Sequence, residues 1–458
     1  MTGVLHIGNA GAFWGDRLGA AAALAVQQPD LDYITLDYLA EVSMSILARQ
    51  RERDPNAGYA GDFIEVVRSL SAILCSRTGH RLRIVTNAGG LNPRACAEVC
   101  RGVLSQAGCR GMRIGIVTGD DVLEQLKNGR GSTDGFANLE TGQPLDSIRD
   151  SLVTANAYLG AEAILEALRQ GADLVITGRV ADPSLTVGPC MHHFGWSWSD
   201  LDRLAGATVA GHLIECGTQV TGGISTHWLE MPDPANLGYP VAEVDADGAC
   251  VITKPANTGG RVEVRTVKEQ LLYEIGDPDA YISPDVLASF LALSVTASGP
   301  DRVRISGARG RPPTGTFKVS ATYRAGYRAS GTLTVFGRDA VSKARRCALV
   351  VEQRLRQDGY EPQQWQAECL GTGDAVPGVF AGGNGAPGFE TVLRLSVADQ
   401  RREVVDRFTR ELMPLVTCGP QGITGFAEGR PRIHEVVGYW PCLIDRRSVA
   451  PRAEVLEV

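Results

Sequence analysis

The sequence has few aromatic residues and no apolar stretch long enough to cross a membrane. Only 6% of its 458 residues are Phe, Trp or Tyr, whereas Gly occurs 54 times. This composition favours an α/β protein with many tight turns over an aromatic-rich β-sandwich. A membrane span needs roughly 20 consecutive apolar residues, and the N-terminus lacks the basic and apolar regions of a signal peptide. We therefore expect a cytoplasmic protein with no membrane partner.

Basic residues are not in excess either. The 45 Lys and Arg residues are outnumbered by 52 Asp and Glu, which gives a net charge of −7. This balance argues against a nucleic-acid partner. The eleven cysteines include no Cys-x-x-Cys pair, and they lie in apolar patterns such as Ile73–Cys75 and Ala95–Cys100. We predict that they are reduced, buried thiols.

Several sequence motifs for cofactor binding are missing as well. There is no Walker A loop, and Gly8, Gly11 and Gly15 do not match the G-x-G-x-x-G dinucleotide fingerprint, although Asp37 follows the next strand where a ribose-binding acid would lie. A nicotinamide-dependent oxidoreductase is therefore the weakest functional hypothesis. No H-E-x-x-H zinc motif occurs, and the metal content stays unknown.

The sequence does contain repeated strand–loop–helix units. In Arg83–Cys100, a β-branched run reaches Thr86, then Asn-Ala-Gly-Gly follows, and Asn92 with Pro93 begins a helical pattern as N-cap and first-turn residue. Similar short apolar runs are the predicted strands 4–7, 33–36, 114–117 and 174–177. Strands alternating with helices predict a parallel, doubly wound (Rossmann-like) sheet with right-handed crossovers.

The length of the chain predicts more than one domain. We expect a core over residues 1–345, with a parallel α/β part at 1–235 and a β-rich part at 236–345, then a helix and Gly/Pro-rich linker at 346–390, and a small α/β domain at 391–458. Within these regions the patterns predict a helix over residues 151–170 and strands at 262–264 and 270–275.

Four loops at the predicted carboxyl ends of strands contain the candidate binding residues, because ligands of parallel sheets bind at this edge. The loops span residues 8–16, 86–92, 118–121 and 177–184. A helix start and glycine-rich backbone favour an anion, and an arginine binds a carboxylate or phosphate. The candidates for substrate or anion binding are Asn9, Trp14, Asp16, Asn87, Gly89, Gly90, Asn92, Arg179 and Ser184. Alternatively, Arg179 only pairs with Asp182 to shape its loop.

Four residues are candidates for catalysis. Asp120 and Asp121 follow a strand, where a carboxylate is a general base, a ligand of a divalent cation or only a helix N-cap. His212 and Glu215 are three residues apart and share a helix face, which suits an acid/base pair or metal ligands. Cys216 lies beside them, but no neighbouring base identifies it as a nucleophile, so a structural thiol is expected.

Taken together, these motifs resemble the acyclic terpene utilisation AtuA family. The resemblance rests on Gly15-Asp16, Leu36–Glu41, Thr86–Pro93, Thr118–Asp121, Ala155–Gly160, Ile176–Arg179 and Gly211–Gly217. It extends from the N-terminus to about residue 345, and the tail, with 419–425 and 439–441, is similar to the small ferredoxin-like domain that follows the family's core. The resemblance implies branched acids or acyl-CoA thioesters as a substrate class, without identifying the reaction step.

The leading hypothesis from these observations is an AtuA-like lyase or hydratase. It would act on a small branched carboxylic acid or its acyl-CoA thioester by abstracting a proton next to a carbonyl, with a divalent cation as the cofactor if the acidic pair binds one. The alternative is a non-catalytic scaffold or substrate-delivery subunit of an enzyme complex. We also expect a homo-oligomer.

Overall fold

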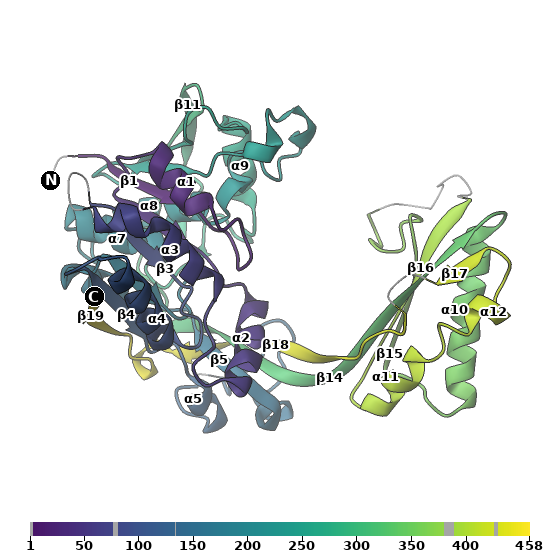
Figure 1. The fold of residues 1–458 in the computed structure, drawn as a ribbon. Helices are drawn as coiled ribbons and strands as arrows, with labels where there is room; N and C mark the ends of the chain where they lie inside the picture. Colours follow the sequence, from purple (N-terminus) through teal and green to yellow (C-terminus); the bar gives the residue numbers. More distant parts are fainter. Residues whose placement is uncertain (1–2, 77–80, 133, 380–388, 426–428) are drawn as a thin grey trace. The chain divides into compact units, whose positions relative to one another are not determined.

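The computed structural model describes residues 3–76, 81–132, 134–379, 389–425 and 429–458 (Figure 1). The chain forms two compact units: unit 1 comprises Met1–Thr322 and Tyr439–Val458, and unit 2 comprises Tyr323–Gly438. This division differs from the sequence-based boundaries at residues 345 and 390, because unit 2 begins earlier and the last residues of the chain return to unit 1. The predicted Gly/Pro-rich linker lies outside the described residues from 380 to 388.

Unit 1 is built on a large mixed sheet. Five strands pair in parallel in the order β1 (Leu5–Asn9), β2 (Tyr33–Leu36), β3 (Arg83–Thr86), β6 (Leu174–Thr177) and β4 (Arg113–Thr118). Antiparallel strands extend it on both sides: β7 (Val241–Val244), β8 (Cys250–Thr253), β12 (Arg302–Ser306) and β11 (Ser294–Gly299) beyond β1, and β19 (Arg452–Glu457) beyond β4. The mixed α/β class is therefore confirmed. The order differs from that of the usual dinucleotide-binding fold, in which the first strand is central.

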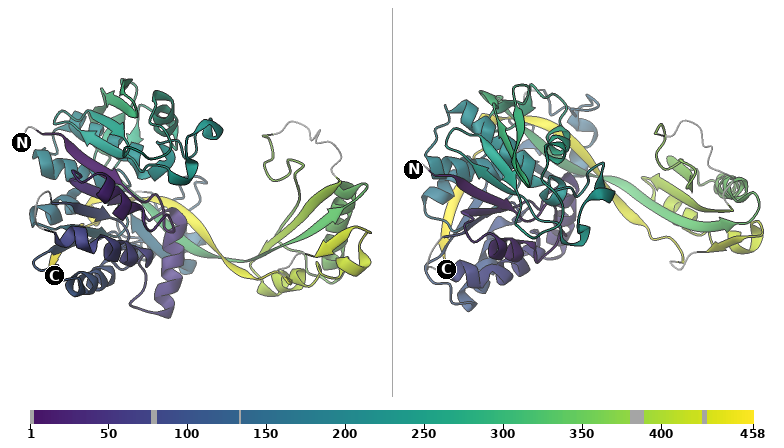
Figure 2. Two further views of the ribbon diagram at one scale, coloured as in Figure 1. Left: turned by 45° about the horizontal axis from the view of Figure 1, so that its top comes forward. Right: turned by 90° about the horizontal axis from the view of Figure 1, so that it is seen from above.

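Two groups of helices accompany the parallel strands (Figures 1 and 2). The first group is α1 (Ala20–Gln27), α3 (Asp62–Cys75) and α4 (Pro93–Gln106), which contact one another; the second is α6 (Glu162–Arg169), α7 (Ser184–Phe194) and α8 (Leu201–Glu215). The first group shares a buried core with strand residues such as Ile34, Ile84 and Ile176. The strands are short and apolar on both faces because helices cover them.

The remaining elements of unit 1 lie in the connections. They are α2 (Glu41–Arg53), α5 (Leu123–Lys127), β5 (Leu152–Ala157), α9 (Val264–Leu272) and a small antiparallel sheet of β13 (Arg309–Arg311), β10 (Leu287–Ser289) and β9 (Tyr281–Ile282). Two predictions are wrong here. The helix expected over residues 151–170 is strand β5 followed by α6, and the strands expected at 262–264 and 270–275 are replaced by α9.

Unit 2 contains an antiparallel sheet with helices on one face. The strand order is β15 (Gln364–Leu370), β16 (Glu390–Asp399), β14 (Thr316–Phe336) and β17 (Ile423–Gly425), and β18 (His434–Asp445) also pairs with β14. The helices α10 (Ala340–Gln357) and α11 (Arg402–Thr409) bury Val351, Val405 and Phe408 in one core with Leu333 and Leu393 of the sheet. A short helix, α12 (Leu415–Cys418), follows. Strand, helix, two strands and helix succeed one another as in split β-α-β motifs.

The cysteines are not all free, buried thiols. Cys75 at the end of α3 and Cys109 form a disulfide with a Cα–Cα separation of 4.6 Å, so the prediction of reduced thiols is wrong for this pair. The other nine are free, and among them Cys418 is exposed. The pair was missed because 34 residues separate the two positions, and only the packing of α3 against the end of α4 brings them together. No helix in the described part of the chain has the length and apolarity of a membrane span.

Gly89 illustrates how tightly the loop after β3 packs. A Cβ at this position would lie 2.5 Å from the carbonyl oxygen of Thr177 and 2.8 Å from the Cα of Pro93, and backbone atoms cannot move aside cheaply. We expect Gly89→Ala to lower the free energy of unfolding by about 2 kcal/mol. Gly102→Ala is the matched control in the adjacent helix, where a Cβ meets nothing within 4 Å, and it should stabilise by up to about 1 kcal/mol. Urea unfolding measures both; equal midpoints for the two variants would contradict the packing argument.

Candidate functional site

The carboxyl ends of the parallel strands bring several predicted site residues together. Asn87, after β3, donates from Nδ2 to Oδ1 of Asp37, after β2, at 2.7 Å. Asp120, after β4, accepts at Oδ2 from the backbone N–H of Arg179, after β6, at 2.9 Å. Two hydrogen bonds thus link the strand ends in pairs, β2 with β3 and β4 with β6. The centre of this arrangement is the Arg179 side chain.

Arg179 is a buried cation with several protein contacts. Its side chain is 3% exposed, and Nη2 lies 3.0 Å from Oδ1 of Asp182. Nη1 donates to the carbonyl oxygen of Leu39, and the guanidinium stacks 4.2 Å from the centre of the Tyr158 ring. The Nε atom is buried without a hydrogen-bond partner in the described structure. The pairing of Arg179 with Asp182 is therefore observed, whereas binding of a substrate anion by Arg179 stays a prediction, for which Nε is the donor left unused.

Asp37 and Asp182 form a pair of carboxyl groups beside this cation. Burial raises the pKa of Asp37 well above its usual value, and the negative charge of Asp182 adds to the effect. Burial also raises the pKa of Asp182, although the charge of Arg179 and a hydrogen bond with Asp37 act in the opposite direction. Two neighbouring carboxyl groups that are shielded from water share one proton more readily than two exposed carboxyl groups do.

A cavity of about 220 Å³ opens beside Arg179 and Asp182. Its other walls come from α2, from the residue that follows β5 and from the β-rich half of unit 1, through Glu41, Tyr158, Glu274, Tyr281 and Lys318. The hydroxyl of Tyr158 donates to Oε1 of Glu41 at 2.7 Å, and Nζ of Lys318 lies 3.8 Å from the same carboxylate. The cavity therefore has two cationic donors and several acids in contact with its space.

His212 and Glu215 form a second, deeper acid/base pair. His212 Nδ1 lies 3.1 Å from Glu215 Oε1, and Nε2 lies 2.9 Å from the carbonyl oxygen of Gln270. Burial lowers the pKa of His212 to about 4 and raises the pKa of Glu215 well above its usual value. A neutral ring that donates from Nε2 accepts at Nδ1, so the carboxyl of Glu215 must be the protonated donor. The pair is thus a neutral hydrogen bond rather than an ion pair.

This pair lies behind the cavity. The His212 ring is 5.6 Å from the ring of Tyr281, which lines the cavity, and the charges of Asp182 and Glu274 raise the pKa of Glu215 further. Oε2 of Glu215 and Oε1 of Gln270 are buried without partners among the described residues. Together with Nε of Arg179, three unsatisfied polar atoms surround this region, which is unusual in a native protein.

The two adjacent aspartates have different environments. Asp120 is 5% exposed and also accepts from Nδ2 of Asn156 at 2.8 Å. Its hydrogen bond with Arg179 N therefore fixes the backbone from which the Arg179 side chain extends. Burial raises the pKa of Asp120 to about 6. Asp121 is exposed and accepts from the backbone N–H of Leu123 at 3.1 Å, a local turn contact before α5, whose N-cap is Val122. Within the described residues, no group of three or more His, Cys, Asp or Glu side chains is arranged to hold a metal ion.

The predicted anion loop uses its hydrogen-bonding groups internally. Oδ1 of Asn87 accepts from Tyr38 N at 2.7 Å, and Gly90 N and Asn92 N donate to the backbone carbonyls of Asn87 and Gly89 at 3.2 and 2.9 Å. Oδ1 of Asn92 accepts from Ala95 N at 3.3 Å as the N-cap of α4. These contacts shape the loop and fix Asp37 rather than point into the cavity.

The remaining predicted residues lie at two other places. Asn9 donates to Thr35 Oγ1 at 3.2 Å, and Asp16 accepts from the hydroxyl of Tyr239 at 2.9 Å. Trp14, in the same loop, packs against the core beside α1 and α3. Ser184 donates to Oδ2 of Asp285 at 2.5 Å. None of these four residues lines the cavity beside Arg179.

Sequence reasoning missed several residues of the site. Glu41 and Tyr158 lie inside the motifs Leu36–Glu41 and Ala155–Gly160, so the motifs themselves were the available signal. Lys318 and Tyr281 come from the β-rich half, where no local pattern marks them. Burial raises the pKa of Cys216 above its usual range, so its thiolate is disfavoured and a structural thiol is the better description.

Comparison with known proteins gives one result. The model of the acyclic terpene utilisation family protein AtuA matches residues 5–455, nearly the whole chain, and this confirms the resemblance seen in the sequence motifs. No curated protein and no solved structure matches the chain.

Proposed function

Because the chain belongs to the acyclic terpene utilisation AtuA family, we propose that it is an enzyme acting on a small branched carboxylic acid or the acyl part of its CoA thioester. The proposed reaction transfers a proton next to a carbonyl group, as in a lyase or hydratase. The family supplies the association with acyclic terpene utilisation. The chemistry is inferred from the cavity beside Arg179.

The observation that supports this chemistry most directly is the pair Asp37 and Asp182. Raised pKa values for both carboxyls bring proton exchange closer to neutral pH, where a general acid or base works best. Asp182 lines the cavity, whereas Asp37 is 5% exposed behind it. We assign Asp182 the role of catalytic base and Asp37 that of a positioning residue that tunes it.

Lys318, which also lines the cavity, offers a cation for the carbonyl. Removal of a proton by the Asp182 carboxylate leaves an electron pair that moves onto the carbonyl oxygen, so a cation must face that oxygen. Lys318 Nζ lies 5.0 Å from the centre of the Tyr158 ring and its side chain is 44% exposed, so it can turn to the substrate. In this scheme Lys318 stabilises the developing negative charge.

The size of the cavity restricts the substrate. About 220 Å³ is below the range of roughly 300 to 1,000 Å³ typical of sites for drug-sized ligands. A small branched acyl group fits this space, and the nucleotide part of a thioester would extend outside it.

Proton exchange provides the test, because it requires no knowledge of the complete reaction. Citronellic and isovaleric acid, free and as CoA thioesters, are incubated with the protein in D₂O, and mass spectrometry follows deuterium uptake at the carbon next to the carbonyl. We expect Asp182→Asn to slow exchange by about 100-fold. Asp150→Asn is the control, because Asp150 is an exposed carboxylate away from the cavity. Equal exchange by Asp182→Asn and the parental protein would refute the role of Asp182.

The alternative function is that of a non-catalytic delivery subunit, and the same experiment distinguishes it from an enzyme. It predicts no deuterium uptake with any of these acids and a stable complex with a catalytic subunit on native purification, whereas a homo-oligomer with exchange activity supports the enzyme. The nicotinamide hypothesis has less support, because Oδ1 of Asp37 already accepts from Asn87 at 2.7 Å and from Leu39 N at 3.2 Å.

A further inference from the structure

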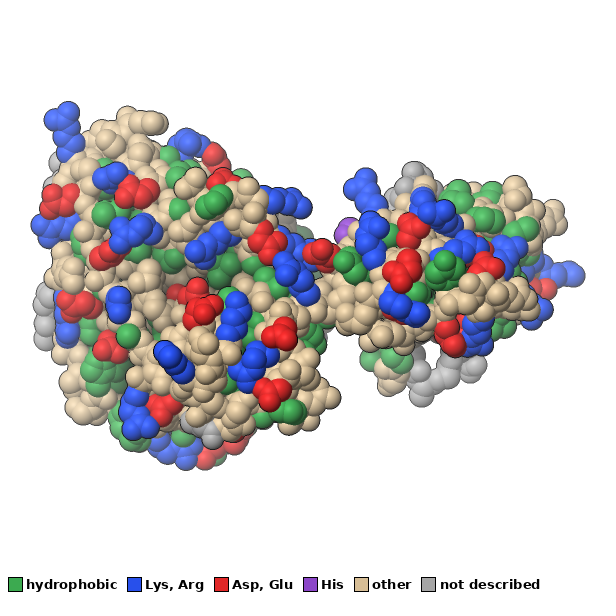
Figure 3. Space-filling model, turned by 90° about the horizontal axis from the view of Figure 1, so that it is seen from below, with side chains coloured by type: hydrophobic (Ala, Val, Ile, Leu, Met, Phe, Trp, Pro, Cys, Tyr) green, Lys and Arg blue, Asp and Glu red, His purple; other side chains and the backbone are tan. Residues whose placement is uncertain are grey.

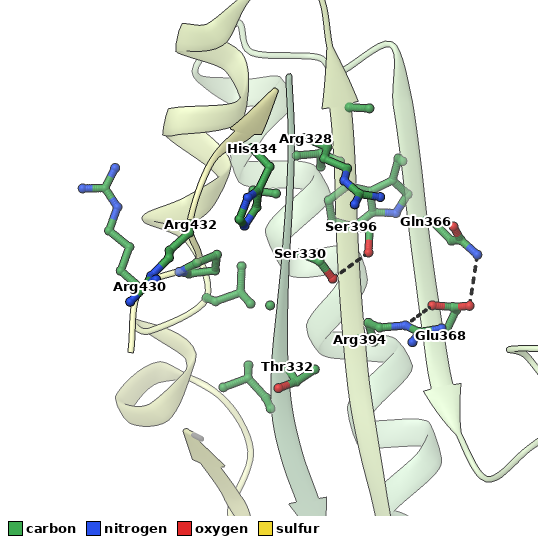
Figure 4. Close-up of a pocket in the computed structure, with 18 of the residues that line it drawn as sticks. Arg328, Ser330, Thr332, Gln366, Glu368, Arg394, Ser396, Arg430, Arg432 and His434 are labelled. Atoms are coloured by element: carbon green, nitrogen blue, oxygen red, sulfur yellow. Dashed lines mark hydrogen bonds and ion pairs between the residues drawn. The ribbon is translucent and has the colours of Figure 1, made fainter. Parts of the chain in front are cut away.

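Unit 2 has a cleft on the face of its sheet that is opposite α10 and α11. Side chains alternate along β14, so Ala329 and Leu333 enter the core with the helices, whereas Arg328, Ser330 and Thr332 line the cleft. Neighbouring residues of β15 and β16 line it too, and the segment 429–434 forms a further wall. Figure 4 shows these side chains around one space. We call this the sheet cleft.

The sheet cleft has a volume of about 1,080 Å³. This is at the upper end of the range of ligand sites in proteins, roughly 300 to 1,000 Å³. A single inorganic ion would fill a small fraction of it. The cleft therefore fits a molecule the size of a nucleotide.

Basic side chains dominate the lining. They are Arg328, Arg394, Arg430, Arg432 and His434, and the only acidic lining residue among those described is Glu368. Arg394 Nε donates to Glu368 at 2.5 Å, and Arg430 pairs with Asp406 at 2.5 Å, outside the lining. Arg328 and Arg432 have no acidic partner in the described part of unit 2. Two guanidinium groups are thus available to an anion.

The floor between these cations carries hydroxyl and amide groups. The Ser330 and Ser396 hydroxyls are 2.8 Å apart on adjacent strands, and Gln366 donates to Glu368 at 3.0 Å (Figure 4). Guanidinium and hydroxyl donors together bind phosphate oxygens well, because arginine binds them in a bidentate geometry. Met413 adds apolar surface to one wall.

The charge of unit 2 fits this interpretation. Residues 323–438 contain 15 Lys and Arg against 13 Asp and Glu, a net charge of +2, whereas the rest of the chain carries −9. Lys and Arg also exceed Asp and Glu on the face of unit 2 that is visible in Figure 3. Unit 2 thus differs from the rest of this acidic protein in the sign of its net charge, and four of its 15 Lys and Arg residues line the cleft, which favours anions there.

We propose that the sheet cleft binds a diphosphate group, carried by a nucleotide-sized molecule or free. Arg328 and Arg432 each contact one phosphate, and the Ser330 and Ser396 hydroxyls donate to the oxygens between them. A second copy of the chain is a poorer occupant, since a two-fold interface would place this basic patch against itself. The proposal concerns unit 2 alone and does not depend on the reaction proposed for unit 1.

Calorimetric titration of the full chain with ADP, pyrophosphate and inorganic phosphate, at constant ionic strength, tests the proposal. We expect saturable binding of ADP or pyrophosphate that is weakened at least about tenfold by Arg328→Gln and by Arg432→Gln. Arg338→Gln is the matched control: it removes the same charge from an exposed residue of unit 2 that does not line the cleft, and binding should not change.

The arms of the experiment also separate the sources of the diphosphate. Binding of ADP but not pyrophosphate identifies a nucleotide, and equal binding of both identifies the diphosphate alone. The proposal fails if no probe binds at millimolar concentration, if inorganic phosphate binds as tightly as pyrophosphate, or if all three arginine variants weaken binding equally. The proposal also fails if the cleft is an interface between two copies of the chain. In that case light scattering would find a dimer for the parental protein and for Arg338→Gln, but a monomer for Arg328→Gln. Thermal unfolding of each variant confirms that it is folded.

Discussion

Replacing Arg179 with Met is expected to lower the free energy of unfolding by about 3 kcal/mol. The guanidinium is 3% exposed and pairs with Asp182 at 3.0 Å, and its charge opposes the rise in the pKa of both Asp37 and Asp182. Without it, the buried carboxyl of Asp37 and the partly exposed carboxyl of Asp182 lose their cation, and the carbonyl of Leu39 loses its donor. Removing one partner of such an ion pair destabilises the fold by more than the pair stabilises it, because the remaining carboxylate is left without a counter-ion in a poorly solvated place. The figure is at the lower end of the usual range because the Asp182 side chain is 34% exposed.

The chain provides a matched control for this substitution. Arg203 and Asp200 also lie three residues apart with a 3.0 Å contact, but their side chains are 45% and 31% exposed. Arg203→Met should therefore change stability by less than about 1 kcal/mol. Urea unfolding at pH 7 compares the two variants.

A second variant separates the loss of the cation from a general packing defect. Adding Asp182→Asn to Arg179→Met removes one of the stranded carboxylates, so the double variant should regain part of the lost stability. If Arg179→Met and Arg203→Met have the same free energy of unfolding, the buried charge of Arg179 does not contribute to the stability of the cavity wall. If the double variant is no better than the single, the loss is one of packing alone.

The sequence predicted which loops meet, but not which of their residues face the cavity. Short β-branched runs such as 84–86 and 174–177 were sufficient to locate parallel strands, and the common direction of those strands brings Asp37, Asn87, Asp120 and Arg179 to one edge. Of the two adjacent candidates after β4, Asp120 is buried and Asp121 is exposed, a difference that the sequence pattern did not assign. Glycine-rich loops suggested anion binding, yet in the structure Gly89 is required by close packing against Thr177 and Pro93.

The errors arose where distant segments decide the local structure. Residues 151–170 have an alanine- and leucine-rich pattern, but the first part becomes β5 because it pairs with β14, which begins at residue 316. Tertiary pairing of this kind overrides local propensity. Asp285 and Lys318 were missed for the same reason: the backbone of Ala161 donates to Asp285 at 2.7 Å across 124 residues, and no local pattern announces such a contact.

Asp120 should make the stability of the protein depend on pH between about 4 and 6. Burial is the largest cause that raises its pKa from 3.8 to about 6, and hydrogen bonds from Arg179 N and Asn156 only partly offset it. In the unfolded chain the carboxyl releases its proton near pH 4, whereas the folded protein holds it to about pH 6. The folded state is therefore favoured at low pH, and this contribution is lost as the pH rises through that window.

The expected loss is about 3 kcal/mol, since each pKa unit corresponds to about 1.4 kcal/mol. Other buried carboxyls titrate as well, so the measurable quantity is the difference in the free energy of unfolding between the parental protein and Asp120→Asn, which has no ionisable group there. Relative to the variant, the parental protein should be about 2.4 kcal/mol more stable at pH 4 than at pH 7, because the carboxyl of the unfolded chain is already partly ionised at pH 4.

Asp121→Asn is the control for this measurement, because it changes an exposed neighbour and leaves the Asp120 carboxyl in its buried place. Its stability should follow that of the parental protein across the same pH range. A difference between the parental protein and Asp120→Asn that stays constant from pH 4 to pH 7 would mean that Asp120 remains ionised when folded. The backbone of Arg179 would then be held by a charged carboxylate, and Asp182 would face a stronger negative field than the structure implies.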